Sequence, residues 1–186
     1  MANAKVQGAD GGGLQGKISF SVAIPVFNLE PYLGQCLDSM LPALRAEDEI
    51  ILALRSSEDG SITIAEHYVQ ENGNIRLLRQ DGIGLSNARN CAVREAYGTY
   101  LIYVDSDDQV DTAQFTHALQ RIREDTSHRD VYFFDFYHDN HRTGKLEPWF
   151  QIGEGGNFQG VENIGKILRQ HRCFWNVWRY ICRRGF

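Results

Sequence analysis

The apolar and polar positions along the chain follow two periodicities, which together predict an α/β fold. Four short, mostly apolar runs predict strands, and the nearly continuous run at 19–25 suits the middle of a mostly parallel sheet. Between these runs, apolar residues recur every three or four positions, which indicates amphipathic helices. The strands are predicted at 19–25, 49–54, 75–78 and 100–104, and the helices at 31–44, from a cap at Asp59 or Ser61 to Asn72, and at 85–96.

The regular alternation of strand and helix predicts the topology. It implies right-handed crossovers and a mostly parallel central sheet with helices on both faces. In open sheets of this kind, ligands bind outside the carboxyl ends of the strands. The loops after the first and fourth strands and the loop before the third helix all belong to that edge, so we expect them to form one site.

The second half of the chain is expected to form a smaller part with mixed strands. Asp111 or Thr112 is expected to cap a helix whose apolar positions run from Phe115 to Ile122. The pattern beyond it predicts a strand at 131–137, a polar turn at 138–144, a strand at 146–152, a loop at 153–156, a helix at 161–171 and a Trp-rich apolar segment at 174–182.

Composition and charge narrow the functional classes. The chain has 186 residues, of which 42% are hydrophobic and 23% charged, as is ordinary for a soluble globular protein. Its formal net charge of -5 argues against nucleic-acid binding and against a polybasic membrane patch. We expect a flexible, glycine-rich leader at residues 1–17 and a single domain at 18–186.

The cysteines and the hydropathy pattern bear on location. The four widely spread cysteines include no Cys-x-x-Cys pair, so we expect reduced thiols rather than a zinc site. The chain has no apolar run of the roughly eighteen residues that a transmembrane helix needs, and its N-terminus lacks the pattern of a signal peptide. These features predict a cytoplasmic protein, either free or peripheral at the membrane.

Three carboxylates follow the fourth predicted strand, at Asp105, Asp107 and Asp108. Like charges packed this closely favour a nearby cation. Residues two apart on an extended backbone point the same way, so Asp105 and Asp107 can reach one ion, and oxygen ligands favour Mg²⁺ or Mn²⁺. An EF-hand is excluded, because Val110 and Thr116 stand where it needs Gly and Glu. The competing explanation is a set of helix caps and solvated turn residues.

Two further loops carry candidate ligand contacts. Gly82 and Gly84 allow close approach of the backbone, and they precede a helix N-terminus with Arg89 one turn in, an arrangement that suits a diphosphate. The alternative is an ordinary loop with a solvated Arg89. After the first strand, Phe27 offers an aromatic face for a nucleotide base, although such a residue is more often part of the core.

Three segments, in this order and spacing, resemble the inverting family-2 glycosyltransferases of GT-A fold: Val22-Ala-Ile-Pro-Val-Phe-Asn28, Gly84-Leu-Ser-Asn-Ala-Arg-Asn90 and Tyr103-Val-Asp-Ser-Asp-Asp108. The match runs from about Phe20 to Val110, and the segment 175–184 resembles a later family element. The resemblance implies a Rossmann-like domain that binds a nucleotide-diphosphate-sugar. It also implies transfer of the sugar to a glycan or lipid-linked acceptor hydroxyl, in glycan, cell-wall or polysaccharide synthesis.

The resemblance also implies roles for matching positions. Asp107 matches the metal-chelating position of the family's Asp-x-Asp motif, and Asp105 matches the carboxylate near the donor ribose and the metal, so the implied cofactor is Mn²⁺ or Mg²⁺. The other implied donor-binding positions are Pro25, Phe27 and Glu30 in the base-and-ribose segment, and Gly84, Arg89 and Asn90 in the segment that faces the donor.

Two departures limit what the resemblance implies. Family members usually carry an Asp-Asp pair directly after the second strand, where the first Asp binds the base, whereas this chain has Leu54 and Arg55. Neither side chain accepts a hydrogen bond from a base N–H, so a uridine preference does not carry over, and Asp59 is the candidate substitute. The family's catalytic base lies in an acidic motif further downstream, so we expect it beyond Phe186 and expect the chain to be a C-terminally truncated piece, inactive alone.

Two other functions stay open. The loss of the Asp pair also suits a catalytically incompetent relative that serves as a nucleotide-sugar binding or assembly module. A nucleotidyltransferase built on the same sheet and metal edge is disfavoured, because Asn28-Leu-Glu-Pro31 stands where a Gly-rich, Lys-containing loop is expected.

Overall fold

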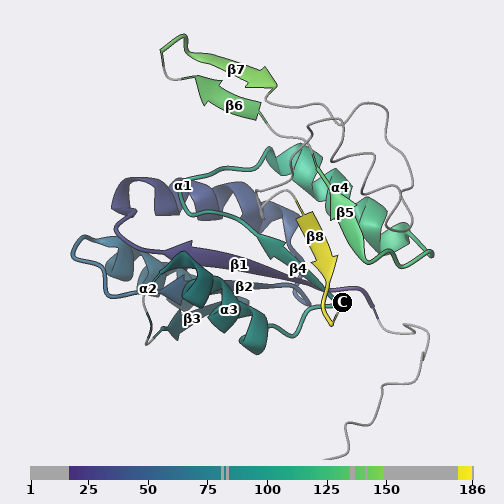
Figure 1. Ribbon diagram of the computed structural model, residues 1–186, viewed down its shortest axis with the longest axis horizontal. Coiled ribbons are helices and arrows are strands. Elements are labelled where there is room, and N and C mark those ends of the chain that lie inside the picture. Colours follow the sequence, from purple (N-terminus) through teal and green to yellow (C-terminus); the bar gives the residue numbers. More distant parts are fainter. Residues whose placement is uncertain are drawn as a thin grey trace, which may run out of the picture.

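The fold is a six-stranded sheet with helices packed on both faces and a separate two-stranded hairpin (Figure 1). The computed structural model describes residues 17–80, 82, 84–134, 137–140, 142–148 and 180–185. The elements are β1 (Phe20–Val26), α1 (Glu30–Met40), η1 (Leu41–Ala43), β2 (Glu49–Leu54), α2 (Ser61–Glu71), β3 (Ile75–Arg79), α3 (Leu85–Glu95), β4 (Tyr100–Tyr103), α4 (Thr112–Glu124), β5 (Val131–Phe133), β6 (Tyr137–Asn140), β7 (Lys145–Pro148) and β8 (Tyr180–Arg183).

The sheet is parallel in its first four strands and mixed beyond them. Its strand order is β3-β2-β1-β4-β8-β5. β1 lies between β2 and β4, and all these pairs are parallel, as the alternation of strands and helices predicts. β8 is inserted antiparallel between β4 and β5. The carboxyl ends of β1, β2, β3 and β4 therefore meet at one edge of the sheet.

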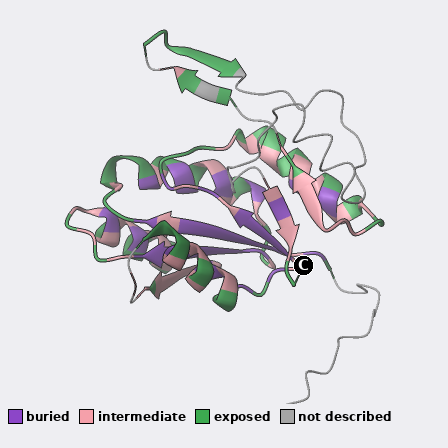
Figure 2. Cartoon of the chain, viewed as in Figure 1, coloured by how far each residue is buried: buried purple, intermediate pink, exposed green. Residues whose placement is uncertain are grey.

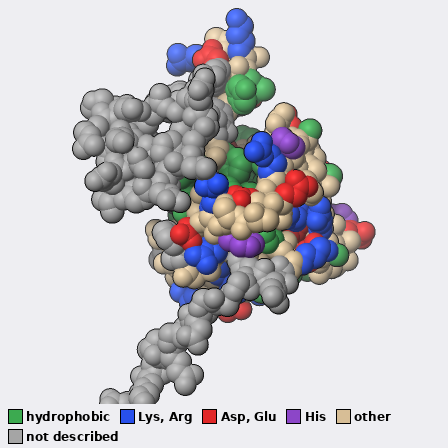
Figure 3. Space-filling view, turned by 90° about the vertical axis from the view of Figure 1, so that its right-hand side faces the viewer, with side chains coloured by type: hydrophobic (Ala, Val, Ile, Leu, Met, Phe, Trp, Pro, Cys, Tyr) green, Lys and Arg blue, Asp and Glu red, His purple; other side chains and the backbone are tan. Residues whose placement is uncertain are grey.

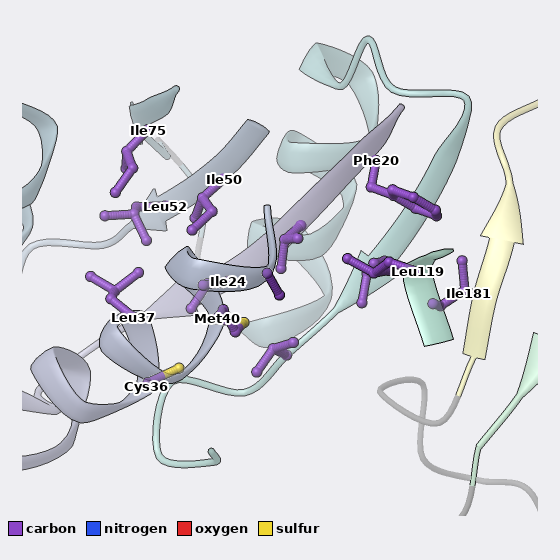
Figure 4. Close-up of a cluster of buried hydrophobic side chains, with 14 of the residues drawn as sticks. Phe20, Ile24, Cys36, Leu37, Met40, Ile50, Leu52, Ile75, Leu119 and Ile181 are labelled. Carbon is purple, nitrogen blue, oxygen red and sulfur yellow. The ribbon is translucent and has the colours of Figure 1, made fainter. Parts of the chain in front are cut away.

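One face of the sheet holds the larger hydrophobic core. Side chains alternate along β1, so that Val22, Ile24 and Val26 point to this face, where α1, α2 and α4 cover them. Figure 4 shows Ile24, Leu37, Met40 and other members of this cluster interleaved. Figure 2 shows burial concentrated in the central strands and in the inner sides of the helices.

The other face is built from small residues. Ala23 and Ala53 on the strands meet Ala88 and Ala92 of α3 and Ala96 directly after it, and all five are buried. The alanines recur every four positions, so they form one stripe along α3. This stripe lets α3 lie close to the sheet and fixes where its N-terminus meets the carboxyl edge.

Three sequence predictions need correction. The N-cap of α2 is Gly60 rather than Asp59 or Ser61, and no side chain caps this helix. The helix expected at 31–44 ends at Met40 and is followed by the short 3₁₀ turn Leu41–Ala43, because Pro42 has no backbone N–H to continue an α-helix. The strand expected at 131–137 includes β5 and the first residue of a second strand, β6. This second strand takes up part of the turn expected at 138–144 and pairs with β7. Gly144, with φ of 62°, closes this hairpin, and its N–H donates to Asn140.

The cap of α4 agrees with its prediction, whereas several other predicted features cannot be compared with the described residues. Asp111 caps α4 by accepting a hydrogen bond from the Gln114 N–H. Cys36, Cys91 and Cys182 are free thiols. Five predicted features lie outside the described residues, namely the leader up to residue 16, Cys173, the loop at 153–156, the helix expected at 161–171 and residues 174–179 of the Trp-rich segment.

The surface shows no segregation of charge on the side drawn in Figure 3, where basic and acidic side chains are intermixed among the described residues. None of the helices in the described ranges has the length and hydropathy needed to cross a membrane.

Gly98, which precedes β4, packs directly against the backbone of β1. A Cβ at this position would lie 2.5 Å from the Ser21 nitrogen and 2.7 Å from the Phe20 carbonyl carbon. We expect Gly98→Ala to lower the free energy of unfolding by about 1–3 kcal/mol, because rigid backbone must shift to admit the methyl group. Urea denaturation measures this change. Gly73→Ala is the matched control, since nothing lies within 4 Å of a Cβ there, and equal stabilities of the two variants would contradict the expectation.

Candidate functional site

A cavity of about 440 Å³ opens at the carboxyl edge of the parallel strands. Its walls come from the loops after β1, β2, β3 and β4 and from the start of α3. It is lined by Pro25, Val26, Phe27, Leu29, Arg55, Gln80, Gly84, Leu85, Ala88, Asp105, Ser106 and Asp107. The loops that the sequence assigns to one edge therefore surround one cavity.

The loop after β4 presents carboxylates to this cavity from a fixed backbone. Ser106 is buried, and its hydroxyl donates to the Pro25 carbonyl at 2.7 Å. The Asp108 N–H donates to the Asp105 carbonyl at 3.0 Å, which closes a tight turn. The carboxylates on either side of Ser106 consequently have backbone positions that are tied to the end of β1.

The two lining carboxylates differ in their partners. Asp105 accepts a hydrogen bond from Arg89 at 2.7 Å, and both side chains are largely buried. The Arg89 Nε is buried and has no hydrogen-bond partner among the described residues. Asp107 is exposed, and no hydrogen bond or ion pair joins it to another described residue. Asp107 is thus the carboxylate available to a ligand.

Negative charge is crowded at this loop. Desolvation, followed by the charges of Asp107 and Asp105, raises the pKa of Asp108 to about 6. Beneath the loop, burial and the charges of the same three aspartates raise the pKa of Cys36 to about 12. The Cys36 thiol therefore stays protonated and donates to the Asp105 carbonyl at 3.7 Å. A cation at the loop would relieve this repulsion.

The loop after β1 is held by the loop after β2. Asn28, with φ of 51°, donates its N–H to Ser57 and accepts from the Glu58 N–H through its side chain. Glu30 and Asp59 complete the link, because the Glu30 N–H donates to Asp59 and the Gly60 N–H donates to Glu30. Both carboxylates bind backbone and neither lines the cavity. In the structure, the Glu30 and Asp59 carboxylates hold the loop after β1 against the loop after β2.

The N-terminus of α3 forms another wall. Gly84 stands directly before the first turn and has a φ of 99°. Residues that carry a side chain rarely adopt this backbone conformation. The exposed N–H groups of this first turn suit an anion. Gln80 is held by a hydrogen bond from Asn87 at 3.2 Å. Asn90 is exposed further along α3 and is not part of the lining.

Arg55 and Gln80 are lining residues that the sequence analysis did not propose as ligand contacts. Each directly follows a strand of the parallel sheet, which is the signal that marks the other lining loops. The Arg55 guanidinium lies 4.5 Å from the centre of the Phe27 ring. One end of the cavity therefore carries a stacked cation and aromatic ring, in contrast to the carboxylates after β4.

The carboxylates fit a metal that is shared with a ligand. Among the described residues, no group of three or more His, Cys, Asp and Glu side chains is arranged to hold an ion by itself. Mg²⁺ is usually bound through one or two carboxylates together with substrate phosphates. Asp107 and Asp105 supply oxygen ligands of this kind next to a helix N-terminus that suits phosphate.

Residues 21–183 match the family described as Glycosyl transferase family 2. The chain belongs to this family. The mostly parallel sheet with helices on both faces is accordingly the GT-A fold of this family.

Two bacterial relatives illustrate the extent of the match. The uncharacterized glycosyltransferase EpsJ of Bacillus subtilis strain 168 is 34% identical over 167 residues, which cover 88% of this chain and 47% of that protein. The uncharacterized glycosyltransferase YibD of Escherichia coli K12 is 33% identical over 165 residues, which cover 88% of this chain and 48% of that protein. The chain spans about half the length of these curated relatives.

The structural comparison agrees with the family. The crystal structure of S. aureus TarS 1-349 in complex with UDP is 28% identical, with a TM-score of 0.55, and the match covers 64% of this chain and 36% of that one. A TarS complex with UDP-GlcNAc is matched with a TM-score of 0.52 and 28% identity, over 64% of this chain and 34% of that one.

Proposed function

We propose that this chain forms the donor-binding part of a metal-dependent, inverting glycosyltransferase. The reaction transfers a sugar from a nucleotide-diphosphate-sugar to an acceptor hydroxyl of a glycan or lipid-linked acceptor, in glycan, cell-wall or polysaccharide synthesis. The observation that carries the proposal is the exposed Asp107 carboxylate, which has no partner among the described residues and shares one cavity with Phe27 and the N-terminus of α3. The UDP and UDP-GlcNAc complexes of TarS support a nucleotide-sugar donor.

The lining residues suit the parts of such a donor. Phe27 offers a ring face to the base. The first turn of α3 offers N–H groups to the diphosphate. Arg89 holds Asp105 in place and keeps a buried Nε that has no partner among the described residues. The proposed donor contacts thus extend from the base to the diphosphate around one cavity.

A divalent cation, Mn²⁺ or Mg²⁺, would be held by Asp107 together with Asp105, and when bound it offsets the charge that develops on the departing diphosphate. The chain's own residues position that leaving group. Ser106 ties the backbone between the two carboxylates to the end of β1, and Arg89 compensates Asp105. Inversion requires a base on the opposite side of the sugar, a role that we assign to no described residue.

Calorimetry tests the proposal with the 186-residue chain. UDP, GDP, CDP and ADP are each titrated in the presence of Mn²⁺ and in the presence of a chelator. We expect at least one of them to bind, with a dissociation constant about tenfold lower or more in Mn²⁺. Failure of all four to bind, or binding that is indifferent to the metal, would contradict the proposal.

A further inference from the structure

Arg55, which directly follows β2, occupies a defined place in the cavity. The Arg55 N–H donates to the Val26 carbonyl at 3.2 Å, and the Gln80 N–H donates to the Leu54 carbonyl at 3.0 Å. Leu54 is only 2% exposed and belongs to the core. The peptide group between Leu54 and Arg55 is therefore joined to β1 on one side and to the residue after β3 on the other, so the Arg55 side chain starts from a fixed point.

The guanidinium is oriented by an aromatic ring. Its central carbon lies 4.5 Å from the centre of the Phe27 ring. Within the described part of the chain, Arg55 has no hydrogen bond or ion pair through its side chain. A guanidinium carries five N–H donors and no acceptor. The donors left over can be used only by a ligand group that accepts hydrogen bonds.

The sheet order separates the Arg55 side chain from the carboxylates that follow β4. Arg55 follows β2 and Asp105 follows β4, and β1 lies between these two strands. Neighbouring strands are about 4.8 Å apart, so the two backbone positions are separated by roughly 10 Å along the edge. That separation places Arg55 and Phe27 away from the end where a metal and a diphosphate are proposed. A planar group stacked at this end would meet an aromatic wall and donor N–H groups.

We propose that Arg55 selects the nucleotide by its base, favouring bases that present a carbonyl oxygen over bases that present an amino group at the equivalent position. The inference rests on the function proposed above and goes beyond it by naming the donor class. Uracil O4 and guanine O6 accept hydrogen bonds, whereas cytosine N4 and adenine N6 donate them. At this exocyclic position, a donor-only side chain pairs with the first two bases and leaves donors unpaired opposite the second two.

The test compares matched nucleotide pairs by calorimetry in Mn²⁺. We expect the chain to bind UDP more tightly than CDP and GDP more tightly than ADP, each by about tenfold, as one good base contact provides. Arg55→Met is expected to bring both ratios close to one, mainly by weakening UDP and GDP. Arg55→Lys keeps the charge but loses the planar fork, so its ratios are also expected to fall.

Arg79→Met is the matched control. Arg79 ends the neighbouring strand β3, is 70% exposed, pairs with Glu66 and does not line the cavity. Its loss removes one cation from the same edge of the sheet, and both ratios are expected to stay at the wild-type values. Thermal unfolding of all three variants checks that each one is folded.

The outcomes separate the two proposals. Wild-type ratios near one, or a preference for CDP and ADP, would overturn base selection by Arg55. Equal weakening of all four ligands in Arg55→Met, with affinity restored in Arg55→Lys, would overturn it as well, because that pattern belongs to a phosphate contact. In both cases metal-dependent binding survives and the proposed function stands. Absence of binding by all four ligands overturns the proposed function and the selection together.

Discussion

Replacing Asp107 with alanine is expected to abolish the metal-dependent part of nucleotide binding and to leave the fold intact. Asp107 lines the cavity, is exposed, and has no hydrogen bond or ion pair with another described residue, so its removal leaves no buried group unpaired. Removing even an outer-shell partner of a metal ligand commonly costs about 10–100-fold in affinity, so we expect a loss of about 100-fold or more for a direct ligand. Calorimetry with UDP in Mn²⁺ measures it.

Asp111→Ala provides the control for this variant. Asp111 carries the same charge a few residues further along, does not line the cavity and caps α4 through the Gln114 N–H. Its loss is expected to lower the free energy of unfolding by about 1 kcal/mol and to leave nucleotide affinity unchanged. An unchanged affinity in Asp107→Ala, or an equal loss in Asp111→Ala, would contradict the assignment of Asp107.

The sequence predicts the parallel half of the fold because its signals are local. Each of the first four strands is a short, mostly apolar segment, and each helix between them carries its own apolar stripe. The rule that parallel strands share a carboxyl edge then brings Pro25, Gly84 and Asp105 around one cavity without any knowledge of contacts. The site is predictable to the extent that it depends on topology.

Features that depend on distant pairing are not predictable in this way. β8 enters the sheet antiparallel between β4 and β5, although about eighty residues separate it from β4. Nothing in the sequence of Tyr180–Arg183 names those partners. The contacts of Glu30 and Asp59 are similar, because each carboxylate binds a backbone N–H of the other loop. A pattern along the chain shows the carboxylates but not which groups they meet.

Arg55 shows how a departure from a family pattern differs from a missing function. Compared with the Asp-Asp pair that family members usually carry after the second strand, Leu54 and Arg55 indicate the loss of an acidic pair. In the structure, Leu54 is buried in the core and Arg55 lines the cavity over Phe27. The position after β2 thus still lines the cavity, with hydrogen-bond donors in place of acceptors. Exchange of hydrogen-bonding character, rather than its loss, is the physical basis of the proposed base selection.

The acidic side chains at the two edges of the sheet differ in their burial and in their pairing. At the carboxyl edge, Asp107 is exposed and unpaired among the described residues. At the amino edge, Asp48 and Glu49 are fully buried, and both are paired. The Glu49 carboxylate accepts from Ser21, from Arg76 and from the Tyr97 N–H. Substitutions at the first edge should therefore act on binding, and substitutions at the second should act on stability.

Asp48→Ala is expected to lower the free energy of unfolding by about 3–5 kcal/mol, the cost of removing one partner of a buried ion pair. Asp48 pairs with Arg123, whose side chain is 8% exposed. The same carboxylate accepts from the Phe20 N–H at 2.9 Å and from the Arg45 N–H at 2.8 Å. Alanine leaves a buried guanidinium and two N–H groups unsatisfied. Urea denaturation followed by circular dichroism measures the change.

Glu66→Ala is the matched control for this loss, because it breaks an ion pair at the surface. The Arg79 and Glu66 side chains are 70% and 50% exposed, so we expect a change within about 0.5 kcal/mol. Any Asp48→Ala protein that remains folded should bind nucleotide in Mn²⁺ like the wild type, since Asp48 lies at the edge opposite the cavity. A cost for Asp48→Ala no larger than that for Glu66→Ala would show that the buried pair contributes little, and a selective loss of nucleotide binding would show that the two edges are coupled.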